Sequence, residues 1–214
     1  DFHIRRSNPR EGALYDAFDR AHAEKVPVIL TGRPDTFSAG FDLKVMMGGG
    51  RAAADMVLTG FRLGERLLGF PTPVVAACPG NAIAMGAFLL LSVDYRIGVP
   101  GPYRVVANEV AIGITMPHFG VEICRQRLAP AHFHRAVIQS ESYVPEDAVV
   151  AGWLDRVVAV DELAGVARGK VEELAKLNAG AYAATKLRAR AGALRAVRAA
   201  IEADEVDFKT IFNL

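Results

Sequence analysis

An uncharged stretch of about twenty residues, Val74–Val93, most constrains how this chain can fold. An apolar helix needs about twenty residues to cross a bilayer, and the stretch has that length. However, Pro79-Gly80-Asn81 lies in its middle, and this triplet is typical of a turn. We therefore predict a buried strand at Pro73–Cys78 and a buried helix at Ala84–Ser92, and no membrane-spanning segment.

The segments on either side of this stretch alternate between strand and helix patterns. In chain order, we expect a helix at Ala13–Ala23, a strand at Val26–Thr31, a loop at Gly32–Gly40, a flexible break at Gly48–Gly50, a helix at Ala52–Leu68, strands at Asp94–Val99 and Tyr103–Ala107, helices at His118–Leu128, at Pro130–Gln139 and from Pro145, and a strand at Leu154–Val160. Strands that alternate with helices indicate a parallel α/β core.

From Asp161 onward the pattern is helical. Apolar residues at spacings of three and four form one stripe along this tail: Leu187, Ala191, Leu194, Val197 and Ile201. We divide the chain into an α/β core, residues 1–160, and a C-terminal helical region, residues 161–214. The stripe fits packing on the chain's own core and packing on another subunit equally well.

Charge and cysteine usage exclude several classes of protein. The chain has 25 Lys and Arg against 24 Asp and Glu, so it has no global field to attract nucleic acid or an anionic membrane. Its two cysteines, Cys78 and Cys124, lie in apolar segments, which is typical of buried, reduced thiols. No secretory signal is visible in the first 14 residues, DFHIRRSNPREGAL. These features together predict a cytoplasmic protein.

Common catalytic motifs are missing. The sequence has no phosphate-binding P-loop and no dinucleotide-binding GxGxxG, and Ser38 does not lie in the GxSxG elbow of serine hydrolases. His132 and His134 are two residues apart on an expected helix, so they point to different faces and do not form a metal pair. We expect no metal site.

Two segments carry a more specific pattern, Thr31–Lys44 and Cys78–Arg96. In each, a strand ends in a glycine-containing turn that leads into a possible helix start. Backbone N–H groups at a helix start are unpaired, and the helix dipole favours negative charge there. Two such groups that converge form an oxyanion hole, which stabilises charge on a carbonyl oxygen. Taken alone, each segment is more readily interpreted as an ordinary βα turn.

The sequence around these turns resembles the enoyl-CoA hydratase/isomerase (crotonase) family. LTGRPDTFSAGFDLK and CPGNAIAMG…DYRI are similar to two family segments, and NEVAIGITMP and AGWLDRVV are similar to later ones in the same order. The resemblance implies a crotonase-like α/β core, built as a ββα superhelix, with a helical C-terminal trimerisation region. It also implies a homotrimer or hexamer that acts on an acyl-CoA thioester, with coenzyme A as part of the substrate and no separate cofactor.

The resemblance also assigns roles to residues. The backbone N–H groups of Phe41 and Met85 would form the oxyanion hole, with Ala84-Met85-Gly86 in place of the family's usual GGG. Ala39 would contact the substrate. Lys44 would pair with a phosphate of coenzyme A, and so would Lys186 and Arg188 of a neighbouring subunit. A solvated side chain is an equally good interpretation of each of these three cations.

The acid/base residues differ from those of the family's hydratases, which usually use two glutamates. The first position is Phe88 here, and the second matches Glu109. Two carboxylates divide the work of adding water, whereas one glutamate can move a proton from C2 to C4 of a 3-enoyl thioester. The resemblance therefore implies Δ3,Δ2-enoyl-CoA isomerisation first, 2-enoyl-CoA hydration second and an inert acyl-CoA-binding homologue third. His118, in a segment where hydratases have small glycines, would add a second polar group or fill the water site.

Overall fold

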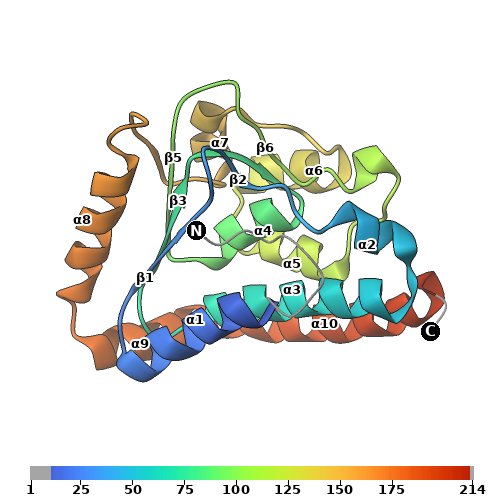
Figure 1. Cartoon of the computed structure of the whole chain (residues 1–214), viewed down its shortest axis with the longest axis horizontal. Helices are drawn as coiled ribbons and strands as arrows, with labels where there is room; N and C mark the ends of the chain where they lie inside the picture. The colour runs from blue at the N-terminus through green and yellow to red at the C-terminus, as the bar shows by residue number, and fades with distance from the viewer. Residues whose placement is uncertain (1–10, 213–214) are drawn as a thin grey trace.

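The computed structural model describes residues 11–212, in which two parallel sheets are surrounded by helices (Figure 1). Residues 1–10 lie outside the described residues, so the structure does not test the prediction that the N-terminal segment carries no secretory signal. The strands are β1 Val28–Thr31, β2 Asp35–Ser38, β3 Val74–Cys78, β4 Gly80–Ile83, β5 Tyr95–Gly98, β6 Val105–Val106 and β7 Arg156–Val157. The α-helices are α1 Glu11–Glu24, α2 Leu43–Gly48, α3 Gly50–Leu68, α4 Met85–Ser92, α5 His118–Arg125, α6 Pro130–Ile138, α7 Pro145–Ala151, α8 Leu163–Ala175, α9 Ala179–Ala189 and α10 Ala191–Ile211.

The chain repeats a strand–strand–helix unit. One sheet has the strand order β1-β3-β5-β7 and the other β2-β4-β6, and the neighbouring strands in both are parallel. Each unit places its first strand in the larger sheet and its second in the smaller one before a helix returns the chain. This arrangement confirms the predicted α/β fold of the ββα-superhelix type.

The uncharged stretch forms the centre of the molecule. Side chains of β3 alternate between the main core and a second apolar cluster beneath α8, so both faces of the strand are buried. Every residue of α4 is buried as well, and a helix that is apolar all round is expected to be buried. The predicted strand and helix are therefore confirmed. No helix among residues 11–212 has the length and apolarity needed to span a membrane.

The predicted turn at Pro79-Gly80-Asn81 is wrong, because the chain continues there into a second strand, β4. A Cβ on Gly80 would lie 2.1 Å from the carbonyl carbon of Asp35 in β2. This glycine is thus needed for the close approach of two strands, and not for a reversal. The expected loop Gly32–Gly40 likewise contains β2.

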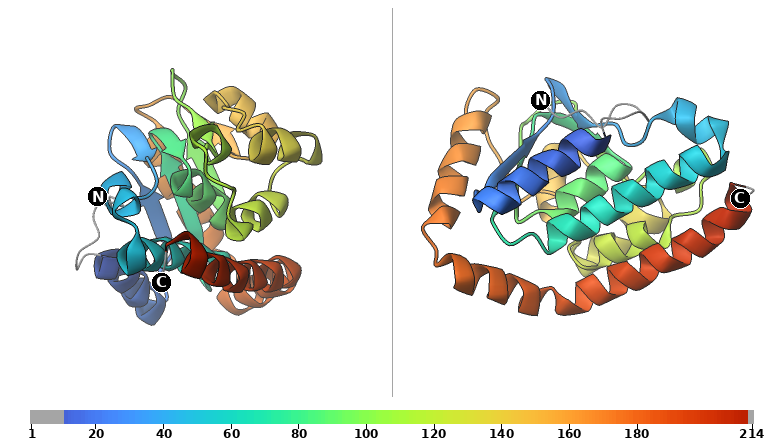
Figure 2. Two further views of the ribbon diagram at one scale, coloured as in Figure 1. Left: turned by 90° about the vertical axis from the view of Figure 1, so that its right-hand side faces the viewer. Right: turned by 60° about the horizontal axis from the view of Figure 1, so that its bottom comes forward.

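The C-terminal helices cover two sides of the core. α8 packs on the larger sheet, and α10 lies along α3 and α5 (Figure 2). Leu194, Val197 and Ile201 are buried in the main core, so this part of the apolar stripe packs on its own chain. Leu187 belongs to α9 and is 49% exposed, which shows that the predicted stripe spans two helices.

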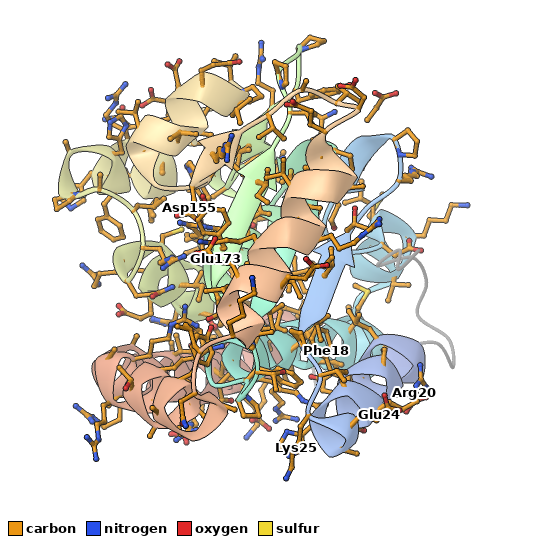
Figure 3. The ribbon with its side chains drawn as sticks, turned by 90° about the vertical axis from the view of Figure 1, so that its left-hand side faces the viewer. Phe18, Arg20, Glu24, Lys25, Asp155 and Glu173 are labelled. Atoms are coloured by element: carbon orange, nitrogen blue, oxygen red, sulfur yellow. The ribbon has the colours of Figure 1, made fainter. Side chains whose placement is uncertain are left out.

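The first helix, α1, also packs on the core. Phe18 of α1 packs edge-on against Phe70, with ring centroids 5.2 Å apart, and is almost fully buried. In Figure 3, Phe18 is directed into the protein, whereas Arg20 and Glu24 lie on the outer side of α1. The helix is thus amphipathic and faces the core with its apolar side.

Candidate active site

Two turns meet at one edge of the smaller sheet. β2 and β4 are adjacent and parallel, so their carboxyl ends bring Gly40 and Ala84 together. A Cβ on Gly40 would lie 3.2 Å from the Cβ of Ala84 and 3.6 Å from the backbone nitrogen of Met85. The turn after β2 therefore touches the first residues of α4, as an oxyanion hole requires.

The amides assigned to the oxyanion hole, those of Phe41 and Met85, are both unpaired. Met85 is the first residue of α4, so its N–H has no acceptor within the helix. Within residues 11–212, neither amide donates a hydrogen bond to the protein. Because the helix dipole favours negative charge at this end, two free donors beside each other suit a developing oxyanion.

Ser38 and Gly86 hold the two turns in place. The Oγ of Ser38 accepts a hydrogen bond from the amide of Gly40 at 3.2 Å, which fixes the turn after β2. A Cβ on Gly86 would lie 2.4 Å from the carbonyl oxygen of Ser38. The last glycine of the family's GGG is therefore required here by close packing against the opposite turn.

Ala84 adopts a backbone conformation that favours glycine. Its φ is 52° and its ψ is −123°, as the residue preceding α4. A non-glycine residue held in such a region costs of order 1–3 kcal/mol and is common at functional sites. The strain is located at the point where the two turns touch.

Glu109 presents a buried carboxyl group with one oxygen, Oε2, that has no hydrogen-bond partner among the described residues. The residue is 7% exposed and precedes the short 3-10 helix Val110–Ile112. Burial raises the pKa of Glu109 from 4.5 to about 7, and a hydrogen bond from its own backbone N–H lowers it in part. A carboxyl group with a pKa near neutrality can both accept and donate a proton at physiological pH.

Cys124, a residue of α5, has its thiol near the carboxyl group of Glu109. Burial raises its pKa well above 9.0, and the charge of Glu109 adds to this effect. Cys78 is also buried. Both cysteines are free thiols, as the sequence predicts. That Cys124 lies beside Glu109 could not be anticipated, because the two residues are not adjacent in the chain.

An apolar wall occupies the position of the family's first glutamate. Phe88 is 1% exposed and meets the ring of Phe119 edge-on, with centroids 6.1 Å apart. A Cβ on Gly120 would lie 3.0 Å from Cζ of Phe88 and 2.8 Å from Sδ of Met116. Phe88 therefore fills its space completely, and it brings no acid/base group.

The other residues predicted to contact the substrate, Ala39, Lys44 and His118, lie in different environments. Ala39 and Lys44 are exposed, and Lys44 forms no ion pair within the described part of the chain. His118 is directed toward α10, with its Nε2 3.4 Å from Oδ2 of Asp207 and its side chain 57% exposed. This pairing gives no support to the predicted role of His118 at the substrate.

The prediction that Lys186 pairs with a phosphate of coenzyme A is wrong. Its side chain is 5% exposed, and its Nζ lies 2.7 Å from Oδ2 of Asp94. The lysine therefore forms an ion pair within its own chain and does not project outward toward a neighbouring subunit. Arg188 is exposed, and its predicted contact with a neighbouring subunit's substrate stays a prediction.

Comparisons with known proteins agree with the geometry. A family model described as enoyl-CoA hydratase/isomerase matches residues 12–214. The crystal structure of an enoyl-CoA hydratase/isomerase family protein from Pseudomonas syringae is 48% identical in sequence, with a TM-score of 0.89, and the match covers 91% of this chain and 85% of that one. A Mycobacterium tuberculosis protein described as an enoyl-CoA isomerase is 42% identical, with a TM-score of 0.87 over 92% of this chain and 86% of that one, and a second structure of the same protein is described as a probable enoyl-CoA hydratase.

A curated relative points to a different reaction in the same family. The carnitinyl-CoA dehydratase of Salmonella enteritidis is 30% identical over 162 residues, which are 76% of this chain. The matched region spans only 62% of the length of that relative. The relatives thus include both an isomerase and a dehydratase, so similarity alone does not choose the reaction.

Proposed function

Because the chain belongs to the enoyl-CoA hydratase/isomerase family, we propose that it converts a 3-enoyl-CoA thioester to the 2-enoyl isomer. One observation carries this choice: Glu109 is a buried carboxyl group whose Oε2 has no partner among the described residues, and Phe88 stands where a second carboxylate would be. Coenzyme A is part of the substrate, and the reaction needs no separate cofactor.

The proposed reaction is a proton transfer within one substrate. The carboxylate of Glu109 removes a proton from C2 of the 3-enoyl thioester, and the electron pair shifts toward the thioester oxygen. The amides of Phe41 and Met85 donate hydrogen bonds to that oxygen as it becomes negative. The carboxylic acid of Glu109 then returns the proton at C4, which leaves the double bond between C2 and C3 and restores the carboxylate.

The pKa of Glu109 suits this cycle. A group with a pKa of about 7 is partly ionised at neutral pH, so it can act as the base without becoming too weak an acid for the return step. We expect kcat/KM to fall about tenfold per pH unit below the pKa of the free enzyme, because only the carboxylate removes the C2 proton.

The substrate preference is tested by measuring two rates on the same preparation. We expect isomerisation of a 3-enoyl-CoA to be faster than hydration of a 2-enoyl-CoA across several chain lengths, since the apolar wall at Phe88 supplies no second acid/base group. Spectrophotometric assays follow both reactions. Hydration as fast as isomerisation would overturn the preference and favour the second candidate, a 2-enoyl-CoA hydratase, which the similarity to a dehydratase supports.

The role of Glu109 is tested by the isosteric change Glu109→Gln. Removing a general acid/base typically costs about 10²–10⁴-fold in rate, so we expect turnover to fall by that factor while acyl-CoA binding persists. Calorimetric titration with a saturated acyl-CoA measures the binding. If the wild-type protein binds the thioester but catalyses neither reaction, the chain is an inert acyl-CoA-binding homologue instead.

We also propose that the chain forms a homotrimer or a hexamer, with the C-terminal helices at the interface. The resemblance to the family motivates this, and the outer faces of α9 and α10 carry exposed apolar side chains such as Leu187 and Val206. Light scattering measures the mass in solution, and a monomer would contradict the proposal.

A further inference from the structure

A cavity lies between α8 and α9 near the start of β5, and none of the proposed catalytic residues lines it. It has a volume of about 580 Å³, and Asp94, Tyr95, Leu174, Leu177, Lys186 and Arg190 are among the residues that line it. Met85 begins α4, and Asp94 lies just beyond its other end. The cavity is therefore separated from the oxyanion hole by the length of that helix, roughly 12 Å at 1.5 Å per residue.

The floor of the cavity carries more positive than negative charge. Lys186 and Arg190 both contact the carboxylate of Asp94, at 2.7 Å and 3.1 Å. The side chains of the three residues are 5%, 14% and 8% exposed, respectively. Two cations thus share one carboxylate in a buried place, where an uncompensated charge is costly. Burial lowers the pKa of Lys186 to about 8, and the neighbouring charge of Arg190 contributes to this.

Donors remain free on this floor. An ammonium group has three N–H donors, and the Lys186 ammonium donates one hydrogen bond within residues 11–212, to Asp94. Arg190 donates hydrogen bonds to the carbonyl oxygens of Leu68 and Val93 and forms an ion pair with Asp94. An anionic acceptor at Lys186 would therefore satisfy both the spare donors and the excess charge.

The walls of the cavity are largely apolar. Leu174 and Leu177 come from the end of α8 and the turn after it. The Nζ of Lys170 lies 4.7 Å from the centroid of the Tyr95 ring. The same Nζ forms an ion pair with Oε1 of Glu173 at 2.7 Å. Figure 3 shows α8, which carries Glu173, on the side of the molecule that faces the viewer. The cavity thus combines a cationic floor with apolar walls.

We propose that this cavity binds a monocarboxylate with an apolar chain, such as a fatty acid. The carboxylate head lies at Lys186 and Arg190, and the chain lies along Leu174 and Leu177. One negative charge balances the excess on the floor, whereas a neutral molecule would leave it uncompensated. The site does not depend on the proposed isomerase reaction, because it shares no residue with the oxyanion hole or with Glu109.

Sodium octanoate is the probe, and isothermal titration calorimetry measures its binding to the full chain. We expect Leu177→Glu to weaken octanoate binding by about tenfold or more, because the new carboxylate repels the ligand at the mouth of the cavity. Ala181→Glu, on the facing wall, should act in the same direction. The matched control is Ile138→Glu, since Leu177 is 52% exposed and Ile138 is 60% exposed but lies on α6 and does not line the cavity. 1-Octanol, which lacks the charge, should bind about tenfold more weakly than octanoate.

Four outcomes would overturn the proposal. Wild-type protein that binds no octanoate lacks the site, and equal affinity in wild type, Leu177→Glu and Ala181→Glu places the ligand elsewhere. Loss of binding in Ile138→Glu as well shows a nonspecific effect of added charge. A change in oligomeric mass caused by Leu177→Glu without octanoate shows that the cavity is filled by a second copy of the chain.

Discussion

Glu109 links the proposed chemistry to the stability of the fold. Its pKa rises from 4.5 to about 7 on folding, which corresponds to about 3 kcal/mol. Because the folded-state pKa is the higher one, the neutral carboxyl's contribution to stability is fully present below about pH 4.5 and is lost as the pH rises through about 7. The ionised Glu109 carboxylate therefore destabilises the folded protein at the pH at which it acts as a base.

This gives a prediction for Glu109→Gln. The glutamine side chain does not ionise, so the variant should gain about 3 kcal/mol in unfolding free energy relative to wild type between pH 4 and pH 8. Urea denaturation of both proteins at several pH values measures the difference, in which the other titrating groups cancel. A difference that stays constant across this range would show that Glu109 is not desolvated in the folded protein.

The strained residue at the oxyanion hole gives a second prediction. Ala84→Gly removes the conflict between a side chain and a φ of 52°, and should stabilise the protein by about 1 kcal/mol. Ala87→Gly in α4, where the backbone is helical, should instead destabilise it by at least about 1 kcal/mol. Thermal or urea unfolding distinguishes the two. Destabilisation by both changes would mean that Ala84 has no strain to release.

Among individual residues, the sequence predicted backbone roles better than side-chain positions. The roles of Phe41 and Met85 come from the family resemblance and stay a prediction, but Ser38 and Gly86 pack as two touching turns require. Lys186 was misinterpreted because a lysine on a helix is usually solvated, and its partner Asp94 is 92 positions away. Nothing in the local pattern could indicate that contact.

At the scale of elements, α10 fixes the helix that forms the wall beside Phe88. Asp204 is 2% exposed, and its carboxylate accepts hydrogen bonds from the amides of His118 and Phe119 at 2.8 Å and 2.9 Å. These are the first two amides of α5, which otherwise lack acceptors. Phe119 stacks on Phe61 with centroids 4.5 Å apart, so the position of α5 sets the apolar wall.

Asp204→Ala should therefore destabilise the protein by about 2 kcal/mol, the upper end for the loss of a helix cap, because the amides it leaves are buried. Asp207→Ala is the matched control, since Asp207 lies on the same helix and contacts His118 but is 56% exposed. We expect that control to change stability by less than about 0.5 kcal/mol. Equal effects in urea denaturation would remove Asp204 from its role as a cap.

The same scale shows which elements could be predicted from sequence. β3 and α4 were located to within a few residues because they are apolar throughout, and α3 because its apolar side chains recur at helical spacing over 19 residues. β2 and β4 were missed. Each has four residues, and the glycines that allow close strand contact, Gly32 before β2 and Gly80 in β4, are of the type that normally marks turns.

The whole molecule is held together by contacts between its ends and its centre. The main core includes Phe18 of α1 and Phe208 of α10, so residues 161–214 contribute to the same apolar core as the sheets. Such contacts between distant segments leave no periodic signal in the sequence. This is why the sequence left open whether the C-terminal stripe packs on its own chain.

The ion pair between Asp94 and Lys186 should be the strongest polar link between the C-terminal helices and the sheet. Removing one partner of a buried pair typically costs about 3–5 kcal/mol, because the other charge is left without compensation. Asp94→Asn leaves both Lys186 and Arg190 without that carboxylate, so we expect it to cost about 3–5 kcal/mol. Lys186→Met should cost less, because Arg190 still contacts Asp94, and the double variant should cost less than the sum by at least about 1 kcal/mol.

The control for this cycle is another ion pair that joins α10 to the core. Arg198 and Glu65 are 2.6 Å apart, but their side chains are 61% and 25% exposed. Exposed pairs contribute at most about 1 kcal/mol, so Arg198→Ala should have a small effect in urea denaturation. If Asp94→Asn cost no more than Arg198→Ala, the buried ion pairs would not be what ties α9 to the start of β5, and apolar packing alone would hold the C-terminal helices in place.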